Sequence, residues 1–123
     1  MIKVTICLRR KAGMSYKEFH DYWVGHHGEL AKRLAPALGI RRYVQSHSLD
    51  SPLNAAMQKS LGMEEPFDGI AETWYDSVDA FANAASTPEG KAALKALRED
   101  EKNFMDLSRS AGWLNEEHVL IEP

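Results

Sequence analysis

The order of strand and helix patterns along the chain is the feature that most constrains its fold. Residues 2–8 alternate apolar and polar side chains as a strand does, and a helical pattern over residues 15–34 follows. Strands are predicted at 40–48, 69–75 and 118–122, and helices over 77–85 and from 87 to about 98 or 100. The resulting order, β-α-β-β-α-β, predicts a ferredoxin-like α+β fold: a four-stranded antiparallel sheet with helices on one face.

The length of the chain, 123 residues, is that of one domain, so residues 1–123 are predicted to fold as a single unit. Residues 49–66 form a long connection with one short helix at 53–61. The strands carry bulky side chains on both faces, whereas the helices can cover only one. We therefore expect a homodimer in which two sheets close face to face into an α/β barrel.

Charge and cysteine content narrow the classes of partner. The net charge is −3 and the two signs are interspersed, so neither nucleic acid nor an anionic membrane is an expected partner. No apolar run is long enough to span a bilayer and the first residues resemble a strand rather than a signal peptide, which predicts a cytoplasmic protein. The single cysteine, Cys7, excludes an internal disulfide.

The segment of residues 15–27 is the strongest candidate for chemistry. Ser15 and Glu18 have the spacing of a capping box, which starts a helix near Tyr16. On that helix Trp23 and His27 share an apolar face. His27 is therefore either a general base or a packed structural histidine that bonds a backbone carbonyl.

Two of the predicted strands carry further candidates. Tyr43 and His47 share one face of the second strand with Gln45, which suits either a ligand-lined cavity or a subunit contact. Glu72 and Trp74 share a face of the third strand, where the carboxylate is either functional or paired with a nearby arginine, Arg9, Arg41 or Arg42.

Cofactor and metal signatures are missing from the sequence. His20, His26 and His27 lack the H-x-x-x-H spacing of a zinc helix, and there is no H-E-x-x-H motif. The glycines form neither a GxGxxG motif nor a phosphate-binding loop. We expect no metal and no cofactor.

Several of these segments together resemble one known family. The W-x-x-x-H spacing of Trp23 and His27, followed by Leu30, resembles the first-helix signature of the EthD domain. Residues 40–47, 68–77, 86–90 and 104–106 are similar to later segments of that family, so the resemblance covers nearly the whole chain. It implies a dimeric ferredoxin-like α/β barrel with a pocket between helices and sheet, and it favours His27, then His47, as site residues.

The resemblance leads to three functional hypotheses. The first is a cofactor-independent oxidoreductase, similar to oxygenases, that acts on a small aromatic or lactone-like metabolite. In it His27 moves a proton, His47, Tyr43 and Glu72 orient the substrate, and Trp23 and Trp74 form apolar walls. The second is an isomerase or dehydratase of similar substrates. The third is a non-catalytic dimer that binds a small molecule in a degradation pathway.

Overall fold

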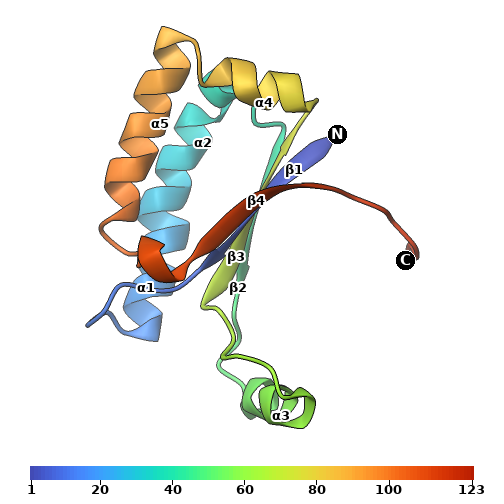
Figure 1. Ribbon diagram of the computed structural model, residues 1–123. Coiled ribbons are helices and arrows are strands. Elements are labelled where there is room, and N and C mark those ends of the chain that lie inside the picture. Colours follow the sequence, from blue (N-terminus) through green and yellow to red (C-terminus); the bar gives the residue numbers. More distant parts are fainter.

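A four-stranded antiparallel sheet with helices packed on one face forms the body of the protein (Figure 1). The computed structural model describes residues 1–123. The strands are β1 (Ile2–Leu8), β2 (Arg42–His47), β3 (Gly69–Tyr75) and β4 (Ala111–Glu116), in the order β2-β3-β1-β4. This arrangement confirms the predicted ferredoxin-like α+β fold.

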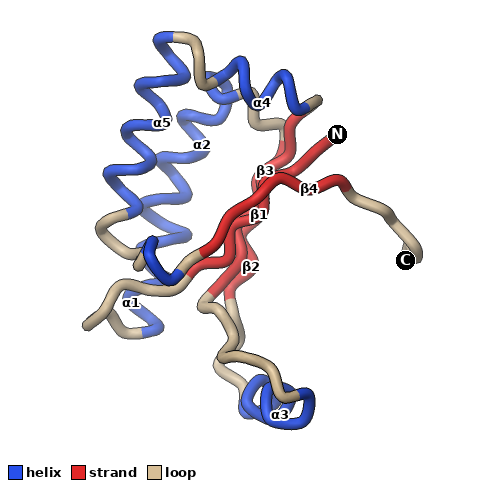
Figure 2. The backbone as a smooth tube through the Cα atoms, viewed as in Figure 1, coloured by secondary structure: helices blue, strands red, loops and turns tan.

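The helices form a second layer over the sheet (Figure 2). Two α-helical segments, α1 (Tyr16–Tyr22) and α2 (Gly28–Leu38), are joined without a break by a π-helical segment, η1 (Trp23–His27). They pack beside α5 (Pro88–Glu101), and α4 (Val78–Ala84) covers the end of the layer. A short 3₁₀ turn, η2 (Leu107–Arg109), precedes β4. No helix is both long and apolar enough to cross a membrane.

The predicted helix starts are confirmed, but the end of α2 differs from the prediction. Ser15 and Glu18 form the expected capping box, and Ser77 and Thr87 cap α4 and α5. The helix was expected to end near residue 34, yet it passes through Pro36 to Leu38. Leu38 is buried against α5, so the extra turn adds to the apolar core, and Gly39 ends the helix with a φ of +69°.

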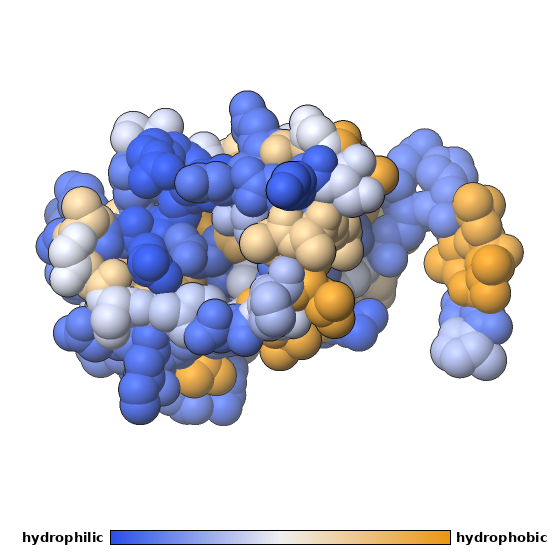
Figure 3. All heavy atoms as spheres, turned by 90° about the horizontal axis from the view of Figure 1, so that it is seen from below, coloured by the Kyte–Doolittle hydropathy of each residue, from blue (hydrophilic) through white to orange (hydrophobic).

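The prediction of a last strand at residues 118–122 is wrong. The fourth strand is β4, which pairs with β1 so that Trp113 lies opposite Thr5. The apolar run Val119-Leu120-Ile121 indicated a strand, but no sheet edge lies beside it and these three residues are exposed. Their side chains stand away from the body at the end of the chain (Figure 3).

The connection between β2 and β3 carries α3 (Pro52–Leu61), which lies beyond the end of the sheet (Figure 1). This helix confirms the prediction of a short helix at residues 53–61. None of its residues is buried, and Leu53, Met57 and Leu61 form an exposed apolar stripe. Arg9 holds the segment between α3 and β3 in place. Its guanidinium donates to the carbonyls of Glu65 and Pro66 and lies over the ring of Phe67.

The core lies between the helices and one face of the sheet, in two clusters. The first is Leu8, Phe19, Trp23, Phe104 and Met105, and the second is Ala31, Leu38, Ala93 and Leu97. We call the sheet face that packs on these clusters the inner face. The outer face has no helix over it, and Ile70 and Trp113 are exposed there.

Candidate functional site

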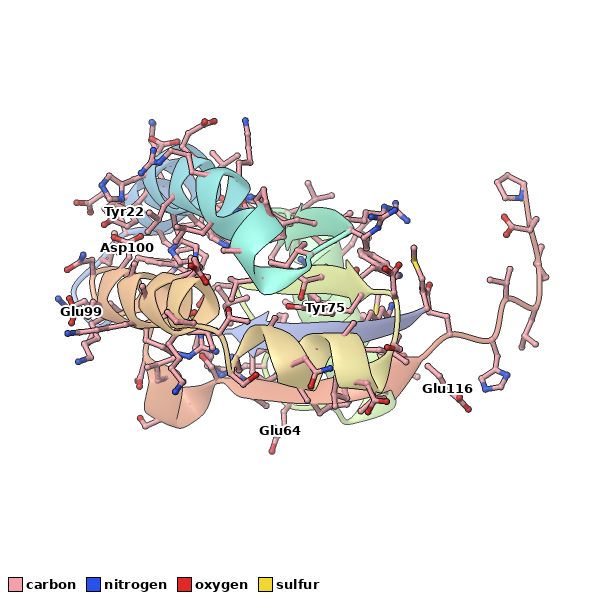
Figure 4. The ribbon with its side chains drawn as sticks, turned by 90° about the horizontal axis from the view of Figure 1, so that it is seen from above. Tyr22, Glu64, Tyr75, Glu99, Asp100 and Glu116 are labelled. Carbon is pink, nitrogen blue, oxygen red and sulfur yellow. The ribbon has the colours of Figure 1, made fainter.

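A cavity of about 230 Å³ lies between the inner face and the helices. Of its 19 lining residues 15 are hydrophobic, so the transfer of an apolar ligand from water into the cavity is favourable. Tyr75, which lines it from β3, lies between the sheet and the helix layer (Figure 4). The lining includes three of the predicted site residues, Trp23, His27 and Tyr43.

The π-helical segment brings two of these residues to the cavity. In η1 the amide of Gly28 donates to the carbonyl of Trp23, five residues back, so the turn is wider than an α-helical one. Trp23 and His27, the first and last residues of η1, are both buried and both line the cavity. Segments of this kind occur often at functional sites.

His27 is held by the carboxylate of Asp100. Its Nδ1 lies 2.8 Å from Oδ2 of Asp100, and both side chains are more than nine-tenths buried. A carboxylate can only accept here, so Nδ1 carries the hydrogen and Nε2, at the far edge of the ring, is left without a partner in the protein. The ring lines the cavity, and Nε2 is therefore the atom available to a ligand.

Asp100 is itself fixed by three further groups. The hydroxyl of Tyr22 donates to Oδ1 at 2.5 Å, Nδ2 of Asn103 donates at 3.2 Å, and Nδ1 of the exposed His26 lies 3.3 Å away. Figure 4 shows Tyr22 and Asp100 beside each other between the first helix and α5.

The electrostatics of Asp100 favour its charged form. Burial alone would raise the pKa of Asp100, but the hydrogen bonds from Tyr22, His27 and Asn103 outweigh it and hold the pKa below its ordinary value. The carboxylate is therefore ionised at neutral pH, and it accepts the hydrogen bond from Nδ1 of His27 in that form.

A second ion pair borders the cavity. Glu101 is buried and accepts from Nη1 of the half-exposed Arg98 at 2.7 Å, and both residues belong to the lining. Arg98 is the cation available to an acidic group of a ligand.

Tyr43 reaches the cavity from β2 and is linked to His47 through Gln45. Nε2 of Gln45 lies 2.7 Å from the Tyr43 hydroxyl, and Oε1 of Gln45 lies 2.8 Å from Nε2 of His47. Burial raises the pKa of Tyr43, although hydrogen bonds from Gln45 and Trp23 oppose it, so the phenol is neutral at physiological pH.

His47 lies outside the cavity lining, in contact with Trp23 and paired with His20. The two Nδ1 atoms of His20 and His47 face each other in a short contact. Burial lowers the pKa of both rings, and for His20 the neighbouring His47 lowers it further. Both histidines are therefore neutral at neutral pH.

Glu72 and Trp74 lie on the outer face, so within one protomer they do not share the cavity with His27. Their register positions place them opposite Thr5 and Lys3 of β1. Glu72 pairs with Lys3 at 2.5 Å rather than with one of the three arginines considered from the sequence. Arg42 lies over the Trp74 ring, whose indole N–H donates to Glu117.

Asp100 and His20 belong to the candidate site, and the sequence analysis did not single them out. Asp100 continues the apolar face that Ala93 and Leu97 form on α5. From this spacing the sequence could have predicted that the carboxylate is buried. His20, on α1, gave no such signal, because its partner His47 lies on the strand β2. No group of three or more His, Cys, Asp or Glu side chains is arranged to hold a metal ion.

Comparison with known proteins places the chain among fungal relatives named decarboxylases. Decarboxylase nsrE of Aspergillus novofumigatus is 28% identical over 120 residues, which cover 92% of this chain and 77% of the relative. A protein of Claviceps purpurea named decarboxylase is 28% identical over 123 residues, which cover 92% of this chain and 82% of the relative.

Solved structures share the fold. An EthD-family protein of Bacillus halodurans, 22% identical, superposes with a TM-score of 0.62 over 96% of this chain and all of its own. Proteins described as dimeric and ferredoxin-like, from Bacteroides fragilis and Thermobifida fusca, also match. The EthD domain family itself matches residues 11–108. Because that match spans most of the chain, the protein belongs to the EthD domain family.

Proposed function

We propose that the protein is a cofactor-independent decarboxylase of small aromatic or lactone-like acids, with His27 as the group that transfers the proton. The observation that carries this proposal is the buried Asp100–His27 pair beside an apolar cavity. A carboxylate that holds an imidazole in one orientation supports general acid–base catalysis by that imidazole. The names of the fungal relatives favour decarboxylation over other proton transfers.

The proposed step balances without a metal or an organic cofactor. The bond between the substrate carbon and its carboxylate breaks, CO₂ leaves, and the electron pair stays on the carbon. Charged His27 gives the proton on Nε2 to that carbon and then regains a proton from water. Asp100 keeps the ring in place during both transfers, because it holds Nδ1.

The oxidoreductase hypothesis from the sequence differs in the fate of the anion. In that reaction neutral His27 removes a proton from the substrate, and the anion reacts with O₂ instead of being protonated. An isomerase or dehydratase would use the same histidine without losing carbon. All three reactions need Nε2 of His27 at the cavity, and their products distinguish them.

We also propose that the protein is a homodimer formed through the outer face, as expected from the sequence. Ile70 and Trp113 are exposed on that face, and burying such side chains against a second copy would remove apolar surface from water. Solved relatives described as dimeric support this proposal. Glu72 and Trp74 would then lie at the subunit contact, where their predicted role as substrate ligands remains a proposal.

The experiment is a turnover assay with hydroxylated aromatic acids, using 1-hydroxy-2-naphthoate as the first probe. Released CO₂ and consumed O₂ are measured together. CO₂ release without O₂ uptake supports the decarboxylase, O₂ uptake supports the oxidoreductase, and a product of unchanged mass supports an isomerase. His27→Ala should lower the rate by about 10²- to 10⁴-fold, whereas His118→Ala, at an exposed histidine of the tail, should not.

A non-catalytic binding protein gives a different result. It would bind the probe in both the wild type and His27→Ala and convert it in neither. Binding without conversion across a panel of hydroxylated and oxo acids would therefore contradict the proposed activity.

A further inference from the structure

One backbone carbonyl fixes the direction of a chain of hydrogen bonds beside the cavity. The side chain of Gln45 places its nitrogen, Nε2, 3.0 Å from the carbonyl oxygen of Trp23. A carbonyl can only accept, so the amide group of Gln45 must point its NH₂ toward the helix and its oxygen away from it. Gly28 permits this approach, because a Cβ at that position would lie 3.3 Å from the same nitrogen.

The oxygen of Gln45 in turn fixes both histidines. Oε1 can only accept, so Nε2 of His47 carries a hydrogen. A neutral imidazole has one N–H, which leaves Nδ1 of His47 as an acceptor and makes Nδ1 of His20 its donor. Nε2 of His20 then has a lone pair, and it is the one side-chain polar atom wholly shielded from solvent that has no partner.

At its other end the same series of hydrogen bonds determines whether the Tyr43 hydroxyl donates or accepts. The second N–H of Gln45 points at the Tyr43 hydroxyl, so the phenol oxygen is an acceptor inside the protein. The structure shows no hydrogen bond from this hydroxyl to a side chain or backbone acceptor of the protein. Because Tyr43 lines the cavity, that hydrogen is available to whatever the cavity holds.

We propose that Tyr43 is a hydrogen-bond donor to an oxygen of the ligand, and that Gln45, His47 and His20 are positioning residues that keep its hydroxyl in the donor orientation. The ligand class that follows is an aromatic molecule with an acceptor oxygen, such as a ketone, enolate or phenolate. This inference deepens the proposed function, because an enolate or phenolate oxygen carries the negative charge that forms when CO₂ leaves.

The test measures binding rather than turnover, with two ligands of nearly equal size. The ketone 1-tetralone has an acceptor oxygen, and its hydrocarbon analogue tetralin has none. Dissociation constants come from the tryptophan fluorescence of the whole protein, since Trp23 lines the cavity. The quantity compared is the ratio of the two constants in each variant, which cancels the general effect of a substitution on the cavity.

Tyr43→Phe should weaken binding of 1-tetralone about fivefold and leave tetralin unchanged, because one neutral hydrogen bond is lost. His47→Phe should reduce the ketone preference, since Oε1 of Gln45 loses its donor and only the Trp23 carbonyl then holds the amide beside Tyr43. His47→Gln, which keeps an N–H donor, should restore it. A purely structural role of His47 would instead weaken both ligands equally.

Three outcomes would overturn the proposal. They are an unchanged preference in Tyr43→Phe, equal losses for the two ligands in His47→Phe, and failure of the wild type to bind 1-tetralone. Thermal melts identify a variant that has not folded, and in that case Gln45→Leu replaces it with the same expected loss of preference. A protein that shows the Tyr43-dependent preference but releases no CO₂ would support this inference and contradict only the decarboxylase proposal.

Discussion

Gly69 lies directly against the indole ring of Trp23, at the start of β3. A Cβ at this position would lie 2.6 Å from Cη2 of Trp23 and 2.9 Å from the carbonyl oxygen of Ser46. Both distances are shorter than a carbon atom tolerates, so any side chain at position 69 must displace the indole. The position of the Trp23 indole, which lines the cavity, therefore depends on a strand residue that has no side chain.

Gly69→Ala should destabilise the fold by about 1–3 kcal/mol, since the added methyl group overpacks the core. The displaced Trp23 should also shift the tryptophan emission. Gly25→Ala is the matched control, because a Cβ at that helical position meets nothing within 4 Å. Equal denaturation midpoints for Gly69→Ala and the wild type would show that Trp23 is not fixed by this contact.

Asp100→Asn should lower kcat by about 10²-fold or more, because the neutral amide no longer stabilises charge on His27. The neighbouring exposed carboxylate offers a control: Glu99→Gln should keep wild-type turnover. Rates of CO₂ release from the same hydroxylated acid give both values. A normal rate in Asp100→Asn would remove the Asp100–His27 pair from the mechanism.

Acid should destabilise the protein through the His20–His47 pair. The pKa of each ring is lowered from 6.5, chiefly by burial. For His20 the neighbouring His47 and then Arg10 lower the pKa further, whereas Asp68 and Asp21 raise it. The unfolded chain then binds more protons than the folded one, so this stability is fully present above pH 6.5 and is lost as the pH falls through the lowered values.

The melting temperature should therefore fall between about pH 7 and about pH 5, and His20→Phe should make that fall smaller. His118→Phe, at an exposed position, serves as the control and should follow the wild type. Identical pH profiles for His20→Phe and the wild type would mean that other groups cause the acid sensitivity.

Ile70→Glu should convert the proposed dimer into a monomer, because a charge on the outer face would be buried without a partner at the subunit contact. Val24→Glu places the same charge on an exposed residue of the helix layer and should leave the dimer intact. Light scattering after size-exclusion chromatography gives both masses. A wild-type monomer would contradict the homodimer.

Local patterns predicted most of the fold, and contacts between distant segments account for the rest. The alternation in residues 69–75 and the caps at Ser15, Ser77 and Thr87 set elements that the structure confirms. The last strand was misplaced because the exposed tail is more apolar than β4. Pairing with the edge of β1, which no local pattern reveals, decides where the strand forms.

The candidate site was predictable only in part. His27 was a candidate because its helix carries an apolar face, whereas its partner Asp100 lies 73 positions away and no local pattern links the two. The partner of Glu72 depends on strand register: Thr5 stands opposite Glu72, and Lys3 reaches it from the same face two residues along β1. Register follows from packing of the whole sheet, so the sequence left three arginines as candidates instead.

The strand β2 carries two sets of side chains in alternation. Tyr43, Gln45 and His47 are linked by hydrogen bonds on the inner face, beside the cavity. Arg42 and Val44 point to the outer face. Since neighbouring positions on a strand point in opposite directions, a slip of one residue against β3 would exchange the two sets. Deletions in this strand should therefore be tolerated only in pairs, because one missing residue would turn the cavity wall outward and the outer surface into the core.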